Sequence, residues 1–165
     1  PAANNGCPWP DRDGDSVIDK DDKCPDIAGT VANDGCPELP EAVKKALNAY
    51  AKTILFDTGK ASIKDQSAGV LQNIIGILNE YPNARFNIEG HTDSVGSEKS
   101  NQILSERRAK TTSQYVISKG IDSTRLSSTG KGESNPVVDC TNCSKDEDQL
   151  NRRSEFIITA GNPGE

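Results

Sequence analysis

The segment 87–119 constrains the fold more than any other part of the chain. It begins with the sequence NIEGHTDSVG and continues into a long stretch of helical periodicity that stops at Gly120. Polar residues recur in this stretch at spacings of four, three and four, which places them on one face of a helix. These residues are Asn101, Ser105, Arg108 and Thr112. The sequence therefore predicts a strand, a turn and a helix with polar side chains on its inner face.

Arg108 is the least expected residue on that face. Apolar residues such as Val116 share the face, and a guanidinium among apolar side chains is costly unless it is paired. Its neighbour Arg107 points about 100° away, toward water. We therefore expect Arg108 to meet an anion, and the nearest carboxylate is Asp93, at the end of the preceding strand.

Spaced motifs continue from this segment almost to the end of the chain. They are His91-Thr92-Asp93, Gly96, Asn101, Leu104-Ser105, Arg108-Ala109 and the sequence NRRSE at 151–155. In this order they resemble the OmpA-like peptidoglycan-binding domain, which Pal lipoproteins and flagellar stator proteins share. The resemblance covers about Thr53 to Ala160. It implies an α/β (α+β) fold in which a βαβαβ-β mixed sheet carries helices on one face.

The resemblance also implies a binding function. The domain would bind peptidoglycan of the diaminopimelate type noncovalently, in the periplasm of a Gram-negative bacterium, and would tether the outer membrane through a segment upstream of Pro1. The free end of such a stem peptide has a carboxylate and an ammonium on one carbon. Arg108 would bind the carboxylate and Asp93 the ammonium. The other pocket residues that the resemblance implies are Asp57, Thr92, Asn101, Ser105 and Arg153.

Structural interpretations of the same residues stay open. Asp93 and Arg108 could form an ion pair that only holds the strand to the helix, and Asp57 could be a turn residue. His91, the only histidine, is expected to be a packed, hydrogen-bonded side chain and not a ligand or base. An arginine in the pocket would lower the pKa of a carboxylic acid placed there, whereas a general acid for glycoside hydrolysis needs a raised pKa. The chain is therefore not expected to be an enzyme.

A separate acidic segment lies at 11–26, where seven aspartates and three basic residues give -4 of the net charge of -6. Carboxylates at alternate positions around Gly14 suit calcium, which takes about six to eight oxygen ligands. The segment resembles a thrombospondin type-3 repeat and lacks the flanking helices of an EF-hand. This resemblance implies calcium as a cofactor, with Asp11, Asp13, Asp15, Asp19 and Asp22 as ligands. The alternative is a solvated acidic linker. The negative charge argues against nucleic acid as a partner.

Three of the five cysteines lie in or near the acidic segment and two lie near the C-terminus. The sequence ANNGCP at 3–8 is matched by ANDGCP at 32–37, which indicates an internal repeat. On that interpretation Cys24 pairs with Cys36, while Cys7 has an upstream partner, is a free thiol or bridges to Cys24. Cys140 and Cys143 could form a disulfide, a redox centre or half a zinc site. A disulfide is preferred because every cysteine would then share an oxidising compartment.

Periodicity divides the rest of the chain into helices and strands. Helices are expected after Pro40, from Lys64 to Glu80 and from Glu98 to Lys119. Strands are expected at Thr53–Phe56, Arg85–Gly90, Arg125–Lys131 and Ser154–Thr159, with a polar loop before the last. Residues 1–38 would form the calcium-binding repeat and 39–165 the OmpA-like domain.

One rival function remains at this point. The chain could be a calcium-dependent adhesion, spacer or protein-interaction module that does not bind the cell wall. Such a module would depend on calcium for partner binding and would tolerate substitution of Asp93 or Arg108. The sequence leaves the oligomeric state open.

Overall fold

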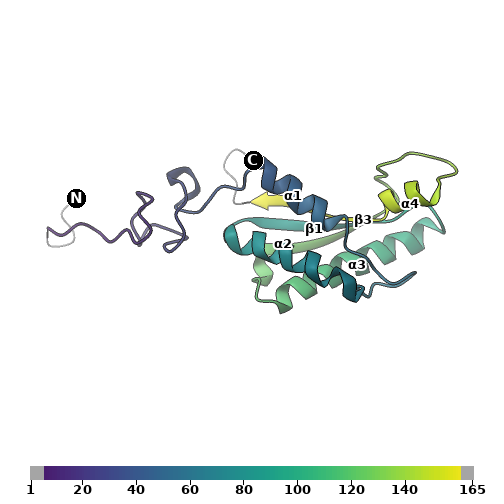
Figure 1. Ribbon diagram of the computed structural model, residues 1–165, viewed down its shortest axis with the longest axis horizontal. Coiled ribbons are helices and arrows are strands. Elements are labelled where there is room, and N and C mark those ends of the chain that lie inside the picture. The colour runs from purple at the N-terminus through teal and green to yellow at the C-terminus, as the bar shows by residue number, and fades with distance from the viewer. Residues whose placement is uncertain (1–5, 161–165) are drawn as a thin grey trace.

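The computed structural model describes residues 6–160, which form an α/β domain preceded by an irregular segment that extends away from it (Figure 1). The domain contains a sheet with the strand order β2-β1-β3. Its strands are β1 (Arg85–His91), β2 (Leu126–Gly132) and β3 (Arg153–Ala160). Its α-helices are α1 (Glu41–Ala51), α2 (Ala68–Glu80), α3 (Glu98–Ser118) and α4 (Lys145–Asn151). Short 3-10 turns lie at Val31–Asn33, Asp65–Ser67 and Ser123–Arg125.

The sheet is mixed, as expected. The central strand β1 runs parallel to β2 and antiparallel to β3. The parallel pair requires a crossover connection, and α3 supplies it. Helix α3 begins at Ser97, whose hydroxyl accepts a hydrogen bond from the Ser100 amide at 3.1 Å. This N-cap satisfies one of the free amides of the first turn.

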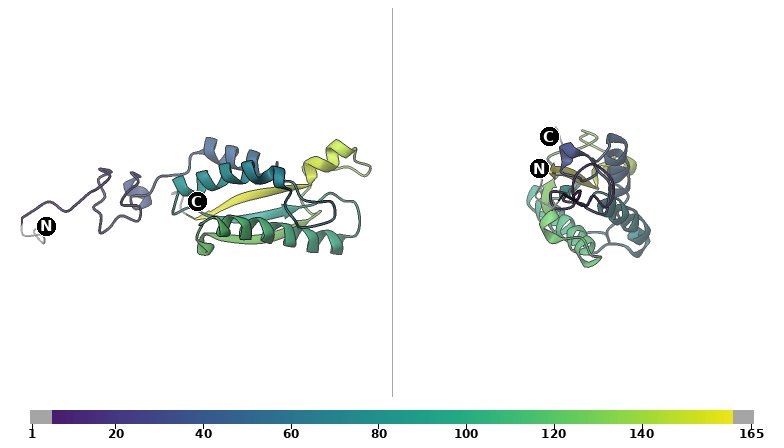
Figure 2. Two further views of the ribbon diagram at one scale, coloured as in Figure 1. Left: turned by 60° about the horizontal axis from the view of Figure 1, so that its bottom comes forward. Right: turned by 90° about the vertical axis from the view of Figure 1, so that its left-hand side faces the viewer.

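The two faces of the sheet differ in character. Phe86 and Ile88 of β1 and Phe156 of β3 are buried on the face that the helices cover (Figures 1 and 2). Helix α1 is joined to β3 through Asn48, whose side-chain oxygen accepts from the Phe156 amide at 2.9 Å. The alternate residues of β1, including Glu89, point to the opposite, polar face. Helices therefore lie on one face, as the resemblance implied.

The predicted strand at Thr53–Phe56 is wrong. The Thr53 and Ile54 amides donate to carbonyls of the last turn of α1, so the chain leaves that helix through a turn. Residue Phe56 then forms only an isolated bridge with Ile63. The segment that follows α1 is thus a loop, whose two sides meet at the bridge between Phe56 and Ile63. The described sheet therefore has three strands where four were expected.

Helix α4 replaces part of the predicted polar loop. Its N-terminus has a capping box, in which Ser144 Oγ accepts from the Glu147 amide and the Glu147 carboxylate accepts from the Ser144 amide. The Ser-x-x-Glu spacing is visible in the sequence and is typical of a helix start. The signal was missed because the helix has little apolar periodicity.

The segment before α1 is held by the disulfide Cys24–Cys36, which confirms that predicted pairing. Cys36 is fully buried, and Leu39 joins the core of the α/β domain. Cys7 is exposed and free, so the alternative bridge to Cys24 is excluded. The first half of the internal repeat includes residues 3–5, which lie outside the described residues. The division of the chain at residue 38 stays a prediction.

Close packing of α3 on the sheet depends on Gly90. A Cβ atom built at this position would overlap the backbone carbonyl of Ser105, and backbone groups cannot move aside as flexible side chains do. We expect Gly90→Ala to lower the free energy of unfolding by about 1–3 kcal/mol because the overpacked helix must shift. Urea denaturation followed by circular dichroism measures this loss.

Gly76 provides the matched control. It lies on an exposed part of α2, with no atom near the position of an added Cβ. Gly76→Ala should raise the free energy of unfolding by about 0.5–1 kcal/mol, because alanine favours a helix over glycine. An equal effect of the two substitutions would show that the contact at Gly90 is not limiting.

Candidate functional site

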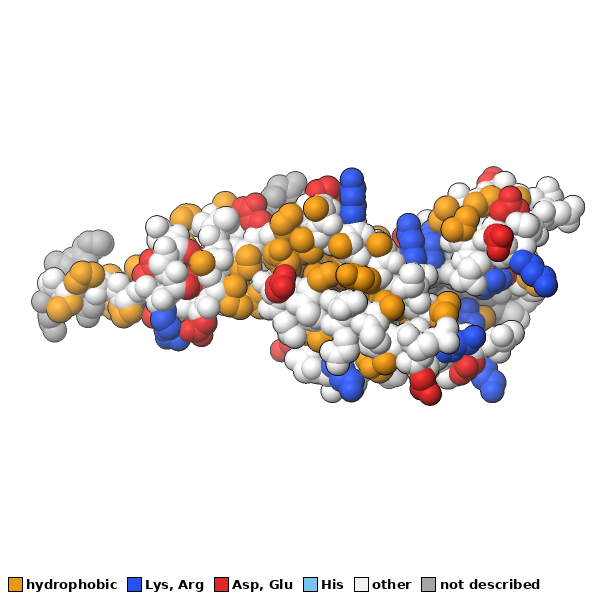
Figure 3. Space-filling model, viewed as in Figure 1, with side chains coloured by type: hydrophobic (Ala, Val, Ile, Leu, Met, Phe, Trp, Pro, Cys, Tyr) orange, Lys and Arg blue, Asp and Glu red, His pale blue; other side chains and the backbone are white. Residues whose placement is uncertain are grey.

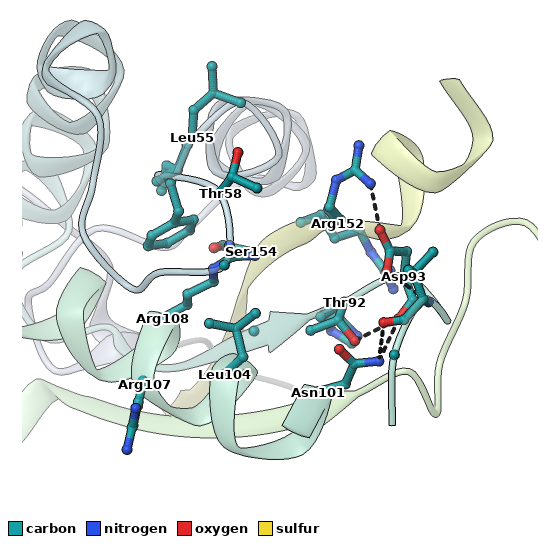
Figure 4. Close-up of a pocket in the computed structure, with 18 of the residues that line it drawn as sticks. Leu55, Thr58, Thr92, Asp93, Asn101, Leu104, Arg107, Arg108, Arg152 and Ser154 are labelled. Carbon is teal, nitrogen blue, oxygen red and sulfur yellow. Dashed lines mark hydrogen bonds and ion pairs between the residues drawn. The ribbon is translucent and has the colours of Figure 1, made fainter. Parts of the chain in front are cut away.

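A cleft of about 910 Å³ lies where the end of β1, the start of α3 and the loop after α1 approach α4. Figure 4 shows its side chains converging from these segments. Asp93 is the one acidic residue among the described residues that line the cleft. The basic residues that line it are Lys64, Arg107, Arg108, Arg152 and Arg153. The cleft is therefore a cationic site with a single carboxylate.

Asp93 is buried and fixed in orientation. Its Oδ1 accepts from the Val95 amide at 3.0 Å, and its Oδ2 accepts from Arg152 Nη1 at 2.5 Å. Asn101 of α3 donates to the carbonyls of Asp93 and Val95 at 3.2 and 3.1 Å, and Figure 4 shows this arrangement. The turn after β1 is thus tied to the first turn of α3, which positions the carboxylate.

Arg108 does not pair with Asp93, so the predicted ion pair is wrong. Its Nε donates to the Lys60 carbonyl at 2.9 Å and its Nη2 to the Asp57 carbonyl at 3.4 Å. The guanidinium also lies 5.0 Å from the centroid of the Phe56 ring, close enough for a cation–π contact. Two carbonyl oxygens and the face of the Phe56 ring therefore contact the Arg108 guanidinium in place of the expected carboxylate.

The electrostatics of Arg108 follow from this arrangement. Burial lowers its pKa most, the charge of Arg152 lowers it further, and Asp93 acts in the opposite direction. Arg108 and Asp93 therefore influence each other across the cleft without contact. A guanidinium that is held by neutral groups keeps its charge available for an incoming anion.

Five of the seven predicted pocket residues line the cleft, and two do not. Thr92, Asp93, Asn101, Arg108 and Arg153 line it. Asp57 contributes only its carbonyl to Arg108, while its carboxylate accepts from Ser62 Oγ at 2.5 Å. Ser105 is fully buried between α3 and β2, where its hydroxyl accepts from the Gly132 amide at 2.9 Å. These two residues support the site from outside.

Arg152 is the cleft residue that the sequence interpretation missed. The NRRSE motif drew attention to Arg153, whose guanidinium instead binds Glu155 Oε1 and the carbonyls of Asn151 and Asn135. Arg152 lies at the end of α4 and reaches Asp93. The capping box predicts α4, and a helix that ends at Asn151 places Arg152 at the helix end and Arg153 in the strand that follows.

His91 is packed as expected, but its ring makes no hydrogen bond of normal length within residues 6–160. The residue is 3% exposed, and neither ring nitrogen has a hydrogen-bond partner among the described residues. Its Nε2 lies 3.5 Å from Glu89 Oε1 and 3.6 Å from Glu155 Oε2. Burial lowers the pKa of His91 most and Arg153 lowers it further, against the opposite effect of the two glutamates.

The acidic segment brings three predicted calcium ligands together. Carboxylate oxygens of Asp11, Asp13 and Asp15 lie within 4.8 Å of one another. Burial raises the pKa of Asp13 most, and the charges of Asp15, Asp22 and Asp11 raise it further. Asp22 is therefore close enough to act on the same cluster.

Two carboxylate oxygens of this cluster have unfilled hydrogen-bonding capacity. Asp13 Oδ2 and Asp22 Oδ2 are buried without a hydrogen-bond partner among the described residues, which is costly for an ionised group. A hard cation would satisfy such oxygens, so the donor set fits calcium. Asp19 is not part of the group of three clustered carboxylates, and its Oδ1 accepts from the Arg12 amide at 2.8 Å.

The Cys140–Cys143 disulfide is present, as predicted. It lies in the loop before α4, directly upstream of the capping residue Ser144. None of the helices in residues 6–160 has the length and apolar content to span a membrane.

Comparisons with known proteins agree with this architecture. The chain is 37% identical to outer membrane porin F of Pseudomonas aeruginosa, over 91% of the chain and 42% of that protein. It is 34% identical to outer membrane protein P5 of Haemophilus influenzae, over 72% of the chain and 32% of that protein. The chain thus spans less than half the length of these relatives.

Solved structures give the same picture. A putative MotB-like protein from Desulfovibrio vulgaris is 28% identical, with a TM-score of 0.58 over 66% of the chain and 68% of that protein. The cell wall anchor of the T6SS from Pseudomonas aeruginosa is 26% identical, with a TM-score of 0.55 over 64% of the chain and 75% of that protein. The peptidoglycan-associated lipoprotein from Burkholderia pseudomallei, 24% identical with a TM-score of 0.58 over 64% of the chain and 88% of that protein, shares the fold.

The family model places the same region in a single family. The model described as the OmpA family matches residues 55–152. This range contains α2, β1, α3, β2 and α4, and with them most of the residues that line the cleft around Asp93. The chain therefore belongs to the OmpA family.

Proposed function

We propose that the cleft binds peptidoglycan noncovalently, through the free end of a diaminopimelate-type stem peptide. The observation that carries this proposal is that one cleft holds the buried Asp93 carboxylate, which contacts Arg152, and the guanidinium of Arg108, which does not contact Asp93. A carboxylate and an ammonium on one carbon need a cation and an anion a short distance apart. The likeness to the cell wall anchor of the T6SS from Pseudomonas aeruginosa supports the same function.

Each charged side chain would have one task. Arg108, held by two carbonyls and the Phe56 ring, would bind the ligand carboxylate with its fork of donors. Asp93 would accept from the ammonium, which competes with Arg152 for Oδ2. No bond is made or broken in this step, so the proposed activity is binding and not catalysis.

The proposal extends to the whole protein. An outer-membrane protein that carries this domain in the periplasm would tether the outer membrane to the cell wall. Figure 3 shows basic side chains gathered at the end of the domain near α4, far from the N-terminal segment. The membrane segment would lie upstream of Pro1, and the acidic segment would space it from the wall-binding end.

We also propose that calcium orders the acidic segment, as in a thrombospondin type-3 repeat. Asp11, Asp13, Asp15 and Asp22 would hold the ion, because the three clustered carboxylates and the buried Asp22 oxygen fit a hard cation. Asp19 would join them only if its carboxylate also reached the ion from its bond to Arg12. Calcium would neutralise the repulsion among these carboxylates, which gives it a structural task.

Retention of the protein on purified insoluble sacculi tests the main proposal. The wild-type protein should sediment with the sacculi, and variants of Asp93 and Arg108 should remain in solution. The rival function, a calcium-dependent protein-interaction module, predicts that the wild-type protein does not sediment.

Arg152→Ala should have a smaller effect than substitution of either proposed ligand-binding residue. The side chain of Arg152 is 36% exposed, and an ion pair with such exposure contributes about 0–1 kcal/mol. We therefore expect less than a tenfold change in affinity for soluble muropeptides, measured by calorimetry. A loss as large as that of Arg108→Ala would show that Arg152 binds the ligand carboxylate directly.

A further inference from the structure

The polar face of the sheet carries a cluster that the proposed function does not use. It consists of Glu89 and His91 on β1 and Glu155 on β3. Glu89 and His91 are two residues apart and so project from the same side of β1. Glu155 is the register partner of Glu89 on the neighbouring strand. The cluster lies on the side opposite the one that the helices cover.

Two glutamates face each other across paired strands, which is unfavourable without a neutralising group. Each carboxylate uses one oxygen for a cation. Glu89 Oε2 lies 3.7 Å from Lys131 Nζ, and Glu155 Oε1 accepts from Arg153 Nε at 2.8 Å. The other oxygens, Glu89 Oε1 and Glu155 Oε2, lie 3.5 and 3.6 Å from His91 Nε2.

His91 supplies an independent sign that a ligand is missing. Its side chain is 1% exposed, and it points Nε2 toward the two free carboxylate oxygens. Neither ring nitrogen makes a hydrogen bond with the described residues. The two carboxylates at 3.5 and 3.6 Å only partly replace the hydration that a buried imidazole loses. The ring is therefore poised for a partner that binds a nitrogen lone pair.

The distances match a metal ion with short bonds. Two ligand atoms about 2.0–2.1 Å from zinc in a tetrahedral arrangement are about 3.4 Å apart. The observed distances from His91 Nε2 to Glu89 Oε1 and Glu155 Oε2 are 3.5 and 3.6 Å. All three ligand atoms lie within 4.8 Å of one another. Calcium fits poorly, because it prefers oxygen ligands and a higher coordination number.

We propose that Glu89, His91 and Glu155 form a zinc-binding site on the polar face of the sheet, distinct from the acidic segment and adjoining the proposed peptidoglycan cleft, which His91 also lines. The ion takes His91 Nε2, Glu89 Oε1 and Glu155 Oε2 as ligands, with water in the remaining position. It neutralises the facing carboxylates and occupies the unpaired imidazole. Lys131 competes with the ion for Glu89, whereas Arg153 holds the far oxygen of Glu155.

The single histidine makes the test direct. Zinc is titrated into the Cys7→Ser protein, which lacks the exposed thiol, in excess calcium, and the imidazole signals are followed by nuclear magnetic resonance. We expect these signals to shift and to saturate at one equivalent of zinc. Unmoved imidazole signals in excess zinc would overturn the proposal.

Matched variants separate the site from nonspecific binding. Glu89→Gln and Glu155→Gln should each weaken zinc binding at least about tenfold, since even indirect ligand contacts have effects of that size. Glu80→Gln, an exposed glutamate at the end of α2, should leave the affinity unchanged. Equal affinity in all three variants would contradict the assignment.

Lys131→Gln keeps the proposal testable if the glutamate variants fold poorly. The Lys131 side chain is 37% exposed, and its removal frees Glu89 from a competing cation. Zinc should then bind a few-fold more tightly, opposite in direction to the loss at Glu89. Unchanged or weaker binding would show that the ion does not contact Glu89.

Discussion

Asp93→Ala and Arg108→Ala are each expected to abolish retention of the protein on sacculi. A charge-assisted hydrogen bond contributes about 1.5–3 kcal/mol, which corresponds to a loss of about 10–100-fold in affinity for each substitution. Asp93 would lose the ammonium of the stem peptide, and Arg108 its carboxylate. Sedimentation with purified diaminopimelate-containing sacculi measures this, with muropeptide calorimetry for the affinities.

Two controls make this result interpretable. Lys110→Ala removes an exposed positive charge from α3 and should leave retention unchanged, which excludes a general charge effect. Arg108→Lys keeps the charge but loses the planar fork and the bond to Lys60, so it should also bind poorly. Circular dichroism must show that each variant is folded, because Arg108 also holds the loop after α1.

Retention that survives both alanine substitutions would contradict the assignment of the cleft. Retention of none of the proteins, wild type included, would contradict wall binding altogether. The rival calcium-dependent module would then gain support, provided that partner binding disappears in chelator. The two outcomes are distinct: the first would show that the wall-binding site lies elsewhere on the protein, and the second would show that the protein does not bind the wall.

Removal of calcium is expected to disorder residues 8–30 and to leave the α/β domain folded. The repulsion among Asp11, Asp13, Asp15 and Asp22 is then no longer neutralised. The domain has its own core, which includes Leu71, Ile88 and Phe156. Hydrogen exchange with mass spectrometry, in calcium and in chelator, should show fast exchange in the acidic segment alone.

Substitution of one aspartate within the cluster should also disorder the acidic segment and leave the rest of the chain unaffected. Asp13→Asn is expected to weaken calcium binding at least about tenfold, because the number of charged ligands tunes the affinity of such sites over decades. Asp139→Asn removes an exposed carboxylate outside the segment and should not alter calcium binding. Loss of the whole fold in chelator would show that the segment and the domain are one folding unit.

Sequence patterns alone were enough where the information is local. The spacing of Leu71, Ile74, Ile75 and Leu78 fixed α2 and its buried face, since burial of an apolar stripe selects a helix. The predicted strand at Arg85–Gly90 and the predicted helix at Glu98–Lys119 agree with β1 and α3 to within one residue at each end. The disulfides Cys24–Cys36 and Cys140–Cys143 join residues that are close in sequence, so their pairing needed little long-range information.

Tertiary structure alone decided which partner each charged side chain reaches. Arg108 meets carbonyls 48 and 51 positions away, and Asp93 meets Arg152 from 59 positions away. The sequence placed Arg108 and Asp93 near each other but could not show that Lys60 and Asp57 present carbonyls to Arg108. The four-strand sheet failed for a related reason, because the turn after α1 leaves Phe56 with a single bridge.

The physical basis of this division is the range of the interactions. The spacing of apolar residues shows which side of a helix or strand is buried, and a segment of a few turns contains all of this information. Ion pairs and hydrogen bonds depend on atomic positions that distant loops and helix ends set, such as the end of α4, where Arg152 contacts Asp93. The sequence therefore determined the family, the helices and the central strand, and the fold determined the chemistry of the cleft and the partners of His91.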